Sequence, residues 1–337
     1  MKEIETRKAV GHILCHDITQ IIPGEFKGAR FRKGHIVREE DIPVLLSLGK
    51  EHLYVWENDG SILHENDAAE ILLEICDGGK MEHTEPKEGK IELSAVCDGI
   101  FKVDSEALYK LNALGNICVS SIHSDIPVKK GDKLCGMRVI PLAVKKELME
   151  NARSVSDKPL MSIMPYKRFR AAAVVTGSEV KNGLIEDGFT PVLKRKLAEY
   201  GAVLEDVCFP GDDGAAITEA VKKYREKGAE LIFCTGGMSV DPDDKTPLAI
   251  KNTGAEIITY GAPVLPGAMI LMSYLDSVPV VGLPGCVMYA GRTVFDLILP
   301  RIMADDKLTK EDFIRMGEGG FCRGCDVCVF PYCGFGR

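Results

Sequence analysis

Four glycine-rich turns in the second half of the chain carry hydroxyl and carboxylate groups that could hold an anionic ligand. They read Thr176-Gly177-Ser178-Glu179, Pro210-Gly211-Asp212-Asp213, Thr235-Gly236-Gly237-Met238-Ser239 and Gly282-Leu283-Pro284-Gly285. Glycine lets a phosphate approach the backbone closely, and the hydroxyls of Thr176, Thr235 and Ser239 can donate hydrogen bonds to it. These turns therefore predict a crevice for an anion.

Carboxylates stand beside the same turns, at Asp212, Asp213, Asp241, Asp243 and Asp244. Unshielded, they would repel a phosphate, and a divalent cation resolves the conflict because Mg²⁺ binds through one or two carboxylates together with ligand phosphates. The alternative, that each glycine only makes a turn and each aspartate only caps a helix, stays open for any turn taken singly.

The elements that would position these turns alternate regularly. Apolar runs and amphipathic stretches follow one another at βαβ spacing, which predicts a three-layer, doubly wound, mostly parallel α/β sheet with ligands at the carboxyl ends of its strands. The expected strands are 171–176, 203–209, 230–235, 269–274 and 278–283, and the expected helices are 191–200, 213–227, 246–252 and 287–303.

Taken in order and at these distances, the turns resemble the molybdopterin-binding domain shared by molybdopterin adenylyltransferases and molybdotransferases, over about residues 168–304. The resemblance implies a domain that holds the pterin's terminal phosphate and dithiolene, often in homo-oligomers. It assigns Asp212 and Asp244 to catalysis and Mg²⁺ binding. It assigns ligand binding to Thr176, Gly177, Ser178, Glu179, Asp213, Thr235, Gly236, Gly237, Ser239, Pro284 and Gly285.

Two branches of the family share these features. Asp244-Lys245-Thr246-Pro247 resembles the Asp-x-Thr-Pro of the adenylyltransferases, whereas three other segments look more like the molybdotransferases: Gly237-Met238-Ser239-Val240, Pro266-Gly267 and Gly282-Leu283-Pro284-Gly285. The resemblance thus implies a Mg²⁺-dependent transferase of molybdenum cofactor biosynthesis that inserts molybdate into molybdopterin or its adenylate. Molybdopterin adenylyltransferase is the alternative enzyme.

Departures from the family's pattern favour a second alternative. The stretch Pro23-Gly24-Glu25-Phe26-Lys27-Gly28-Ala29 lacks the usual aspartate, Leu265 and Ala268 replace paired lysines, and Cys286-Val287 replaces an Asn-Pro. Fewer cations would remain for molybdate. The chain could then be a non-catalytic carrier or maturation factor that holds the cofactor and docks a molybdoenzyme.

The tail holds four of the 12 cysteines, at Cys322, Cys325, Cys328 and Cys333. Thiols spaced by two, two and four residues can converge on one centre, which predicts an iron–sulfur or zinc site; free or redox-active thiols are the alternative. The other eight are scattered through apolar contexts, as reduced buried thiols are.

Composition excludes several classes of protein. The chain has 337 residues with 42 Lys and Arg against 50 Asp and Glu, a net charge of -8 that argues against broad attraction to nucleic acid or an anionic membrane. Its apolar runs are too short to span a bilayer. The first residues lack the apolar core of a secretory signal, so a cytoplasmic location is expected.

Two domains with connecting segments are expected. Residues 1–150 read as a mixed α+β domain, 151–167 as a linker, 168–304 as the α/β domain, and 305–337 as a connector with the Cys-rich tail. No catalytic constellation is visible before residue 150. His12 and His16 have helical ligand spacing in a strand-like context, so surface or core histidines are favoured over a metal site.

Overall fold

The structure is a computed structural model that describes all residues except 1, 23–25, 56–60, 240, 242–243 and 337. The chain divides into two compact units. The first comprises residues 1–97, 101–124 and 128–163, and the second comprises residues 98–100, 125–127 and 164–337. Along the part of the chain that is described, no helix combines the length and apolar character needed to cross a bilayer.

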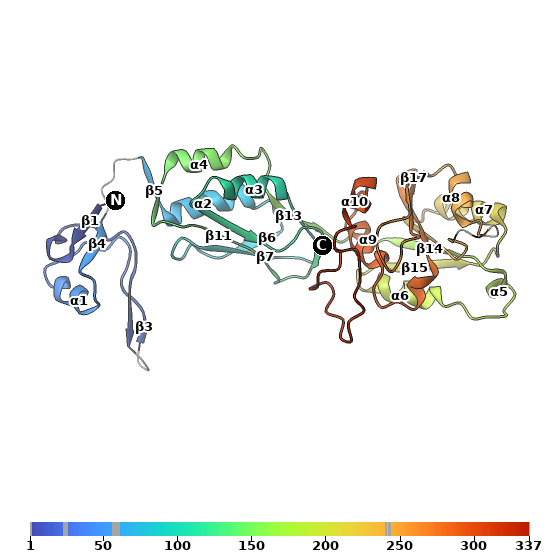
Figure 1. The fold of residues 1–337 in the computed structure, drawn as a ribbon, viewed down its shortest axis with the longest axis horizontal. Helices are drawn as coiled ribbons and strands as arrows, with labels where there is room; N and C mark the ends of the chain where they lie inside the picture. The colour runs from blue at the N-terminus through green and yellow to red at the C-terminus, as the bar shows by residue number, and fades with distance from the viewer. Residues whose placement is uncertain (1, 23–25, 56–60, 240, 242–243, 337) are drawn as a thin grey trace. The chain divides into compact units, whose positions relative to one another are not determined.

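The first unit begins with small paired strands around a short helix. Strand β1 (Lys2–Glu5) pairs antiparallel with β4 (His52–Val55), β2 (Ile18–Ile22) pairs with β3 (Phe26–Phe31), and α1 is Asp41–Ser47 (Figure 1). Residues that are far apart in sequence close one apolar core between these elements. Its buried members are Ala9, Leu14, Ile18, Phe31, Val37, Leu45, Leu53 and Val55.

The rest of the first unit is built on an antiparallel sheet in the order β6-β7-β11-β9. Alternate residues of β7 are buried, which is the pattern of a strand with one covered face. This half confirms the predicted mixed α+β character. The elements over residues 62–153 are β5 (Ile62–His64), α2 (Glu65–Cys76), β6 (Met81–His83), β7 (Ile91–Ala95), β8 (Gly99–Val103), α3 (Ser105–Ala113), β9 (Ile117–Ser121), β10 (Ile126–Val128), β11 (Lys133–Val139), β12 (Ala143–Lys145) and α4 (Lys146–Arg153). Residues 99–100 of β8 and 126–127 of β10 belong to the second unit.

The second unit contains a six-stranded sheet in the order β15-β14-β16-β19-β18-β17. Four neighbouring strands are parallel: β15 (Val203–Cys208), β14 (Arg170–Val175), β16 (Leu231–Thr235) and β19 (Val278–Leu283). The last two strands in this order, β18 (Leu271–Leu275) and the edge strand β17 (Glu256–Tyr260), are antiparallel to their neighbours. The predicted mostly parallel α/β sheet is therefore confirmed.

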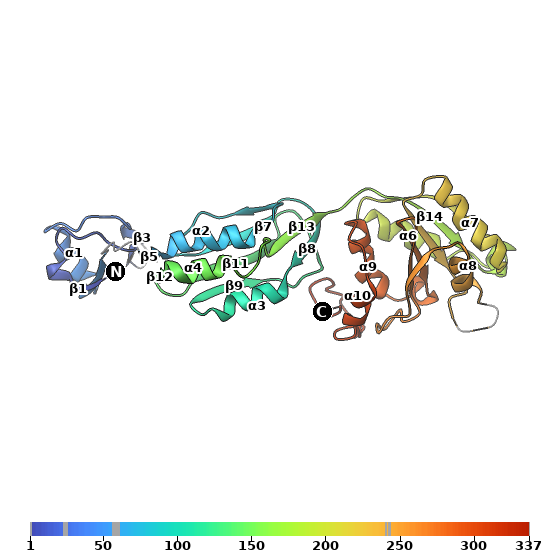
Figure 2. The ribbon, with the colours of Figure 1, turned by 90° about the horizontal axis from the view of Figure 1, so that it is seen from above.

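Strand alternation in this sheet separates two cores. Ala171, Ala173 and Val175 of β14 pack into one cluster with α6 (Phe189–Ala198) and α9 (Val294–Met303). Ala172 and Val174 face the other cluster, with α7 (Gly214–Glu226) and α8 (Thr246–Asn252). Figure 1 shows α6 and α7 on opposite sides of β14, and α7 and α8 lie side by side in Figures 1 and 2. The second unit is thus the three-layer fold that was predicted.

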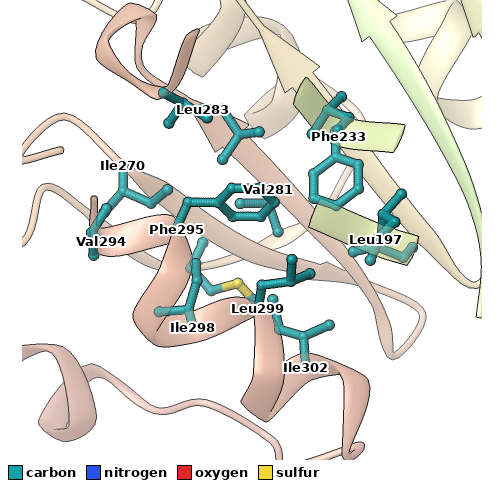
Figure 3. Packing of buried hydrophobic residues seen from close by; sticks show 14 of the residues in the cluster. Leu197, Phe233, Ile270, Val281, Leu283, Val294, Phe295, Ile298, Leu299 and Ile302 are labelled. Carbon is teal, nitrogen blue, oxygen red and sulfur yellow. The ribbon is translucent and has the colours of Figure 1, made fainter. Parts of the chain in front are cut away.

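The core beneath α9 is formed by large apolar side chains (Figure 3). The rings of Phe295 on α9 and Phe233 on β16 meet edge to face, with centroids 5.5 Å apart and an 83° angle between planes. This T-shaped arrangement is favourable for two aromatic rings. A buried ion pair between Lys196 and Asp296 joins α6 to α9 on the same face of the sheet. The layer over this face is therefore fixed by both packing and charge.

Two segments that were expected to be irregular contain regular structure. The predicted linker 151–167 includes the end of α4 and the strand β13 (Met161–Pro165), which pairs with β8 in a three-stranded sheet of order β10-β8-β13. The predicted connector contains α10 (Lys310–Arg315), whose Phe313 is buried. Each element is too short for its apolar periodicity to show in the sequence.

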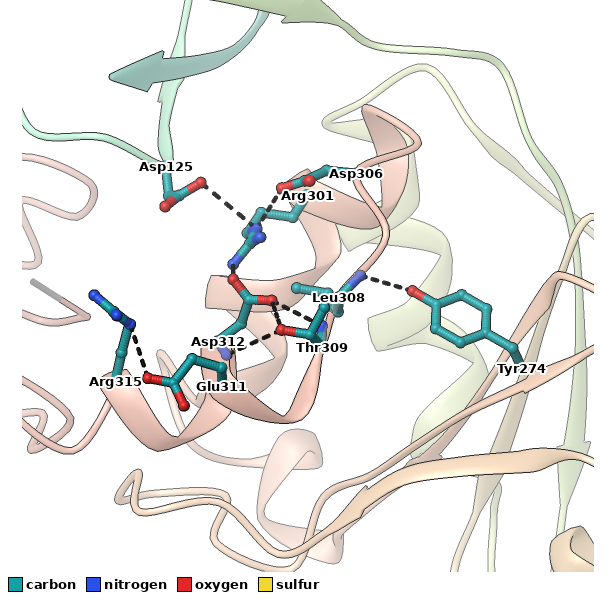
Figure 4. Close-up of polar contacts among 9 residues, drawn as sticks. All are labelled: Asp125, Tyr274, Arg301, Asp306, Leu308, Thr309, Glu311, Asp312 and Arg315. Atoms are coloured by element: carbon teal, nitrogen blue, oxygen red, sulfur yellow. Dashed lines mark hydrogen bonds and ion pairs between the residues drawn. The ribbon is translucent and has the colours of Figure 1, made fainter. Parts of the chain in front are cut away.

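A buried arginine holds the segment after α9 (Figure 4). The Arg301 guanidinium lies 2.6 Å from the Asp306 carboxylate, 2.9 Å from that of Asp312 and 3.6 Å from that of Asp125. Thr309 caps α10 in a reciprocal arrangement with Asp312. The segment is consequently anchored to α9 by charge, which a flexible connector would not be.

Candidate functional site

The candidate site lies where the chain leaves β14 and β16 in opposite directions. After β14 the chain enters α6 on one face of the sheet, and after β16 it enters α8 on the other. Neighbouring parallel strands whose connections diverge leave a crevice at their carboxyl ends, which is where open α/β sheets bind ligands. The first and third glycine-rich turns of the sequence border this crevice.

Thr176 joins these two turns. Its backbone N–H and its Oγ1 each donate a hydrogen bond of 2.9 Å to the carbonyl of Thr235. A Cβ atom on Gly236 would lie 2.6 Å from Thr176 Oγ1, and the φ of Gly236 is +80°. Only glycine fits that space and that backbone conformation. The predicted grouping of Thr176, Thr235 and Gly236 is therefore present.

Asp212 joins the first turn to the second. Its Oδ2 accepts hydrogen bonds from both the N–H (2.8 Å) and the hydroxyl (2.7 Å) of Ser178. Lys181 of the short helix α5 (Ser178–Lys181) adds a further link, because its Nζ donates to the Pro210 carbonyl at 2.9 Å. The turn after β15 is thereby held against the turn after β14.

Asp244 closes the loop after β16. Its Oδ2 accepts the N–H of Ser239 at 2.8 Å, and a Cβ on Gly237 would lie 3.6 Å from its Oδ1. The same Cβ would lie 2.9 Å from Thr246 Oγ1. Gly237, Asp244 and Thr246 thus surround one small space at the start of α8.

Two buried hydroxyls at this place lack hydrogen-bond partners among the described residues: Thr235 Oγ1 and Thr246 Oγ1. Both residues are fully buried. A buried polar group without a partner is costly, and a bound ligand is one way to supply the partner. Thr246 stands in the Asp-x-Thr-Pro segment, so its position could have been singled out from the sequence as a ligand-binding residue.

Tyr260 was not foreseen. It comes from the edge strand β17, and its hydroxyl donates to the carbonyl of Met238 at 2.8 Å and lies 3.3 Å from that of Ser239. Burial, and secondarily the nearby Asp244 carboxylate, raise the pKa of this phenol. Tyr260 therefore supports the loop after β16 as a neutral donor. No local pattern links it to that loop, because the contact depends on the order of strands.

Some predicted residues take other roles or lie apart. Asp213 is the N-cap of α7, where its Oδ1 accepts the N–H of Ala215 at 2.9 Å, as the helix-cap alternative expected. The fourth turn touches the third through Gly282, whose Cβ would lie 2.7 Å from Met238 Cε. Gly285, in contrast, faces open space. Val240 and Asp243 lie outside the described residues, as do Pro23, Gly24 and Glu25 of the N-terminal motif.

Asp212 and Asp244 differ from metal ligands gathered in a protein cage. Among the described residues no group of three or more His, Cys, Asp or Glu side chains lies close enough to hold a metal ion. Each aspartate uses Oδ2 for a hydrogen bond within the loops, and Oδ1 takes none from the described chain. This arrangement fits Mg²⁺ bound through one or two carboxylates plus ligand phosphate and water.

Cys286 and the four cysteines of the tail lie in different surroundings. Burial raises the pKa of Cys286, which disfavours a thiolate at this position. In the tail, Cys325 and Cys328 are exposed, while Cys322 and Cys333 are half-buried and pack against the core. The Phe330 N–H and the Arg292 guanidinium lower the pKa of Cys328. The four thiols do not form a ready metal cluster within the described chain.

Comparisons with known proteins match parts of this chain. A family model described as a probable molybdopterin binding domain matches residues 172–304, and a domain of unknown function, DUF8806, matches residues 3–57. Residues 172–304 are thus a domain of the molybdopterin-binding family, as the resemblance predicted.

Individual relatives cover only parts of the chain. A CinA-like protein of Mycobacterium tuberculosis is 32% identical over 90 residues, which are 26% of this chain and 21% of that protein. A CinA-like protein of Mycolicibacterium vanbaalenii is 36% identical over 94 residues, or 28% of this chain and 22% of that protein. The chain therefore matches about a fifth of the length of these curated relatives.

Two solved structures are similar to parts of this chain. The molybdopterin biosynthesis enzyme MoaB of Thermus thermophilus is 16% identical, with a TM-score of 0.35, and covers 42% of this chain and 97% of its own. The molybdopterin biosynthesis MoeA protein of Pyrococcus horikoshii is 14% identical, with a TM-score of 0.35, and covers 90% of this chain and 75% of its own.

Proposed function

We propose that this protein binds molybdopterin or its adenylate in the crevice of the second unit and acts as a Mg²⁺-dependent transferase of molybdenum cofactor biosynthesis, inserting molybdate. The observation that carries the proposal is the joining of three turns at one sheet edge by Thr176 and Asp212, with Asp244 closing the third. The buried hydroxyls of Thr235 and Thr246, which have no partner among the described residues, add donors for a phosphate. The family match supports the choice of ligand.

In this proposal the loop residues position the ligand and react with nothing. Phosphoryl-group chemistry depends mainly on positioning and charge stabilisation, so few reactive side chains are required. Mg²⁺, when bound, would neutralise phosphate charge. Asp212 and Asp244 would hold it through the oxygens that the loops leave unused. Backbone groups of Gly236 and Gly237 would approach the phosphate because no side chain intervenes.

The test is molybdate-dependent release of AMP from adenylated molybdopterin, measured anaerobically with the full chain. We expect release that requires Mg²⁺ and is lost in Asp244→Ala. The matched control is Asp206→Ala, because Asp206 lies on β15 and pairs with Lys227 at the surface. Absence of AMP release by the unaltered protein would contradict the transferase.

The adenylyltransferase alternative is favoured by one segment, Asp244-Lys245-Thr246-Pro247, which lies at the crevice. Lys245 adjoins the second turn, since a Cβ on Gly214 would lie 3.7 Å from the Lys245 Cβ. The same assay separates the two reactions. An adenylyltransferase would consume ATP and molybdopterin without molybdate, whereas a molybdotransferase would release AMP only when molybdate is present.

The carrier alternative is favoured by Leu265, which stands at a position where the family has a lysine and is 54% exposed. A carrier would bind molybdopterin with no turnover in either assay. Deleting the tail, residues 311–337, would not be a clean test of docking. The deletion would also remove Phe313 and Phe335, which are buried in the core. Replacing the exposed thiols, Cys325→Ser with Cys328→Ser, leaves that core intact.

The metal proposed for the tail is tested with the same pair of variants. If the four thiols gather around zinc or an iron–sulfur centre, anaerobically purified protein contains about one equivalent of zinc or a cluster's iron, and the double variant loses it. Elemental analysis measures both. If the unaltered protein and the double variant contain equal amounts of metal, the metal is bound elsewhere and the four thiols are free.

A further inference from the structure

The first unit contains a pocket of about 440 Å³ whose walls are mostly polar. It lies at the N-terminus of α2, beside the loop 86–88 and the segment 16–19. Its size is within the range of about 300 to 1,000 Å³ that is usual for small-molecule sites. The pocket belongs entirely to the first unit, so it is separate from the crevice described above.

One wall is built from a buried histidine and a lysine. His64 is 1% exposed, and its Nε2 donates to the carbonyl of Cys15. Its Nδ1 accepts the Asn66 N–H at 3.2 Å and lies 2.8 Å from Lys33 Nζ. Burial lowers the pKa of His64, so the ring is neutral and Lys33 is the donor. A fixed ammonium group with further hydrogens is therefore present at the wall.

A buried carboxyl group beside an arginine also lines the pocket. Glu65 is 4% exposed, and its Oε2 lies 3.9 Å from Arg138. Burial raises the pKa of Glu65. This favours the neutral form of the carboxyl group and weakens its attraction to the Arg138 guanidinium. The 3.9 Å separation is also longer than a hydrogen bond. Much of the donor capacity of Arg138 is thus available to a ligand.

Donors exceed acceptors around the rest of the pocket. Lys50 and Lys87 line it, and neither ammonium group has a hydrogen bond or ion pair with the described residues. The Nδ1 of His16 is buried at the same place and has no partner among them. One carboxylate, Asp17, already accepts the Lys33 N–H at 2.7 Å. In a chain with a net charge of -8, this gathering of cations is local.

We propose that this pocket binds a small molecule through an oxyanion group, phosphate or carboxylate, held by Lys33, Lys50, Lys87 and Arg138. The remaining carboxylate on the lining, Glu88, would accept a hydrogen bond from a donor elsewhere on the same molecule. Charge-assisted hydrogen bonds of this kind are roughly twice as strong as neutral ones.

Arg138 also gives the ligand room beyond the pocket. It lines a second hollow of about 430 Å³ on the open face of the sheet, over β7, β9 and β11. Gly136 lies in this hollow, and a Cβ there would meet only the Lys90 side chain, at 3.9 Å. The uncharged part of a ligand could therefore lie across the sheet while its anion stays at the pocket.

The test is isothermal titration of the full chain with inorganic phosphate, pyrophosphate and malonate, each against sodium chloride of equal ionic strength. We expect saturable binding of at least one probe, and the probe that binds distinguishes phosphate from carboxylate. Lys50→Gln with Lys87→Gln should weaken it by about tenfold or more, since each removes a charge-assisted hydrogen bond. Lys110→Gln on α3, outside the pocket, is the matched control.

A crevice variant separates this site from the second unit. Gly237→Val would fill the space beside Thr246 and should leave binding at the pocket unchanged. Circular dichroism checks that each variant is folded. The proposal is overturned if no probe gives saturable heat, if the paired lysine variant binds as well as the parent, or if Gly237→Val alone abolishes binding.

Discussion

The carboxylate of Asp212 binds both the N–H and the hydroxyl of Ser178 through a single oxygen, Oδ2, at 2.8 and 2.7 Å. This pair joins the turns after β14 and β15. The other carboxylate oxygen, Oδ1, accepts no hydrogen bond from the described residues. One aspartate can therefore serve two purposes at once. It fixes the shape of the crevice and offers a charged oxygen to a cation or ligand.

The two purposes can be separated by the Asp212→Asn and Asp212→Ala variants. Asparagine keeps an oxygen for Ser178 but removes the charge, whereas alanine removes both. If charge is what matters, both variants should lose AMP release by about a hundredfold or more, the size of effect expected for one electrostatic group at a reacting centre. The assay is AMP release over a Mg²⁺ series.

If Asp212 acts only by shaping the loop, Asp212→Asn should retain most of the activity and only Asp212→Ala should lose it. That result would remove Asp212 from the set of proposed Mg²⁺ ligands. Asp206→Asn, on the strand β15 that precedes this turn, provides the control for loss of a surface charge.

Gly237 gives a second prediction. Its φ is +54°, and an added Cβ would lie 2.9 Å from Thr246 Oγ1. Gly237→Ala should therefore weaken molybdopterin binding, because the methyl group enters the space beside the Thr246 hydroxyl, which has no hydrogen-bond partner among the described residues. It should also lower the free energy of unfolding by about 1 kcal/mol through the left-handed backbone. Fluorescence titration and urea unfolding measure the two effects.

Gly254→Ala is the matched control for Gly237→Ala. Gly254 also has a positive φ, +92°, but a Cβ there would meet nothing within 4 Å. It should show the loss of stability without the loss of binding. Equal binding by the two variants would argue that the space beside Thr246 holds no part of the ligand.

The turns that form the crevice could be predicted from the sequence more completely than the residues that hold those turns in place. Residues of the glycine-rich turns come together because parallel strands end at one edge, and this follows from element order alone. Thr246 could have been singled out only through its Asp-x-Thr-Pro segment, and Tyr260 could not be assigned from the sequence. Tyr260 reaches the loop after β16 only because β17 forms the antiparallel edge of the sheet, beside β18.

Outside the crevice, too, the arrangement of residues depends on tertiary contacts. His16 was considered with His12, four residues away, yet in the structure it shares a pocket with His64. No periodic pattern relates residues 48 positions apart, so a pocket of this kind is invisible to sequence reasoning. In the same way, the polar segment after α9 is ordered by Arg301, whose three carboxylate partners come from separate positions in the chain.

Arg301 provides a third prediction. Its side chain is 7% exposed and faces Asp306, Asp312 and Asp125. Arg301→Ala would leave three carboxylates without their cation, and we expect a loss of about 3 to 5 kcal/mol in the free energy of unfolding, as when one partner of a buried ion pair is removed. Urea unfolding followed by circular dichroism measures it.

Arg315→Ala is the control for Arg301→Ala. Arg315 pairs with Glu311 one helical turn away, and its side chain is 78% exposed. An exposed pair of this spacing contributes about 0.3 to 0.5 kcal/mol, so the control should be nearly neutral. Similar losses in the two variants would mean that the Arg301 cluster does not hold the segment after α9.

The buried imidazole of His64 makes the stability of the first unit depend on pH. Its pKa is lowered in the folded state from the ordinary value of 6.5, mainly by burial and then by Lys33. Above pH 6.5 neither state is protonated and the contribution is complete. As pH falls below 6.5, the unfolded chain takes up a proton first, so stability should fall, by at most about 1.4 kcal/mol per pH unit for this group.

His64→Asn tests this dependence, because asparagine is a good N-cap residue and can still accept the Asn66 N–H at the start of α2. His16, whose pKa is also lowered by burial, contributes in the same direction, and Glu65, whose pKa is raised, in the opposite one. The informative quantity is therefore the difference between the parent and the variant in urea midpoint, measured from pH 7.5 to 5.5. The parent should lose stability more steeply than His64→Asn, while His52→Asn, at an exposed position, should follow the parent. Parallel curves for the parent and His64→Asn would show that the ring is protonated as easily in the folded chain as in the unfolded one.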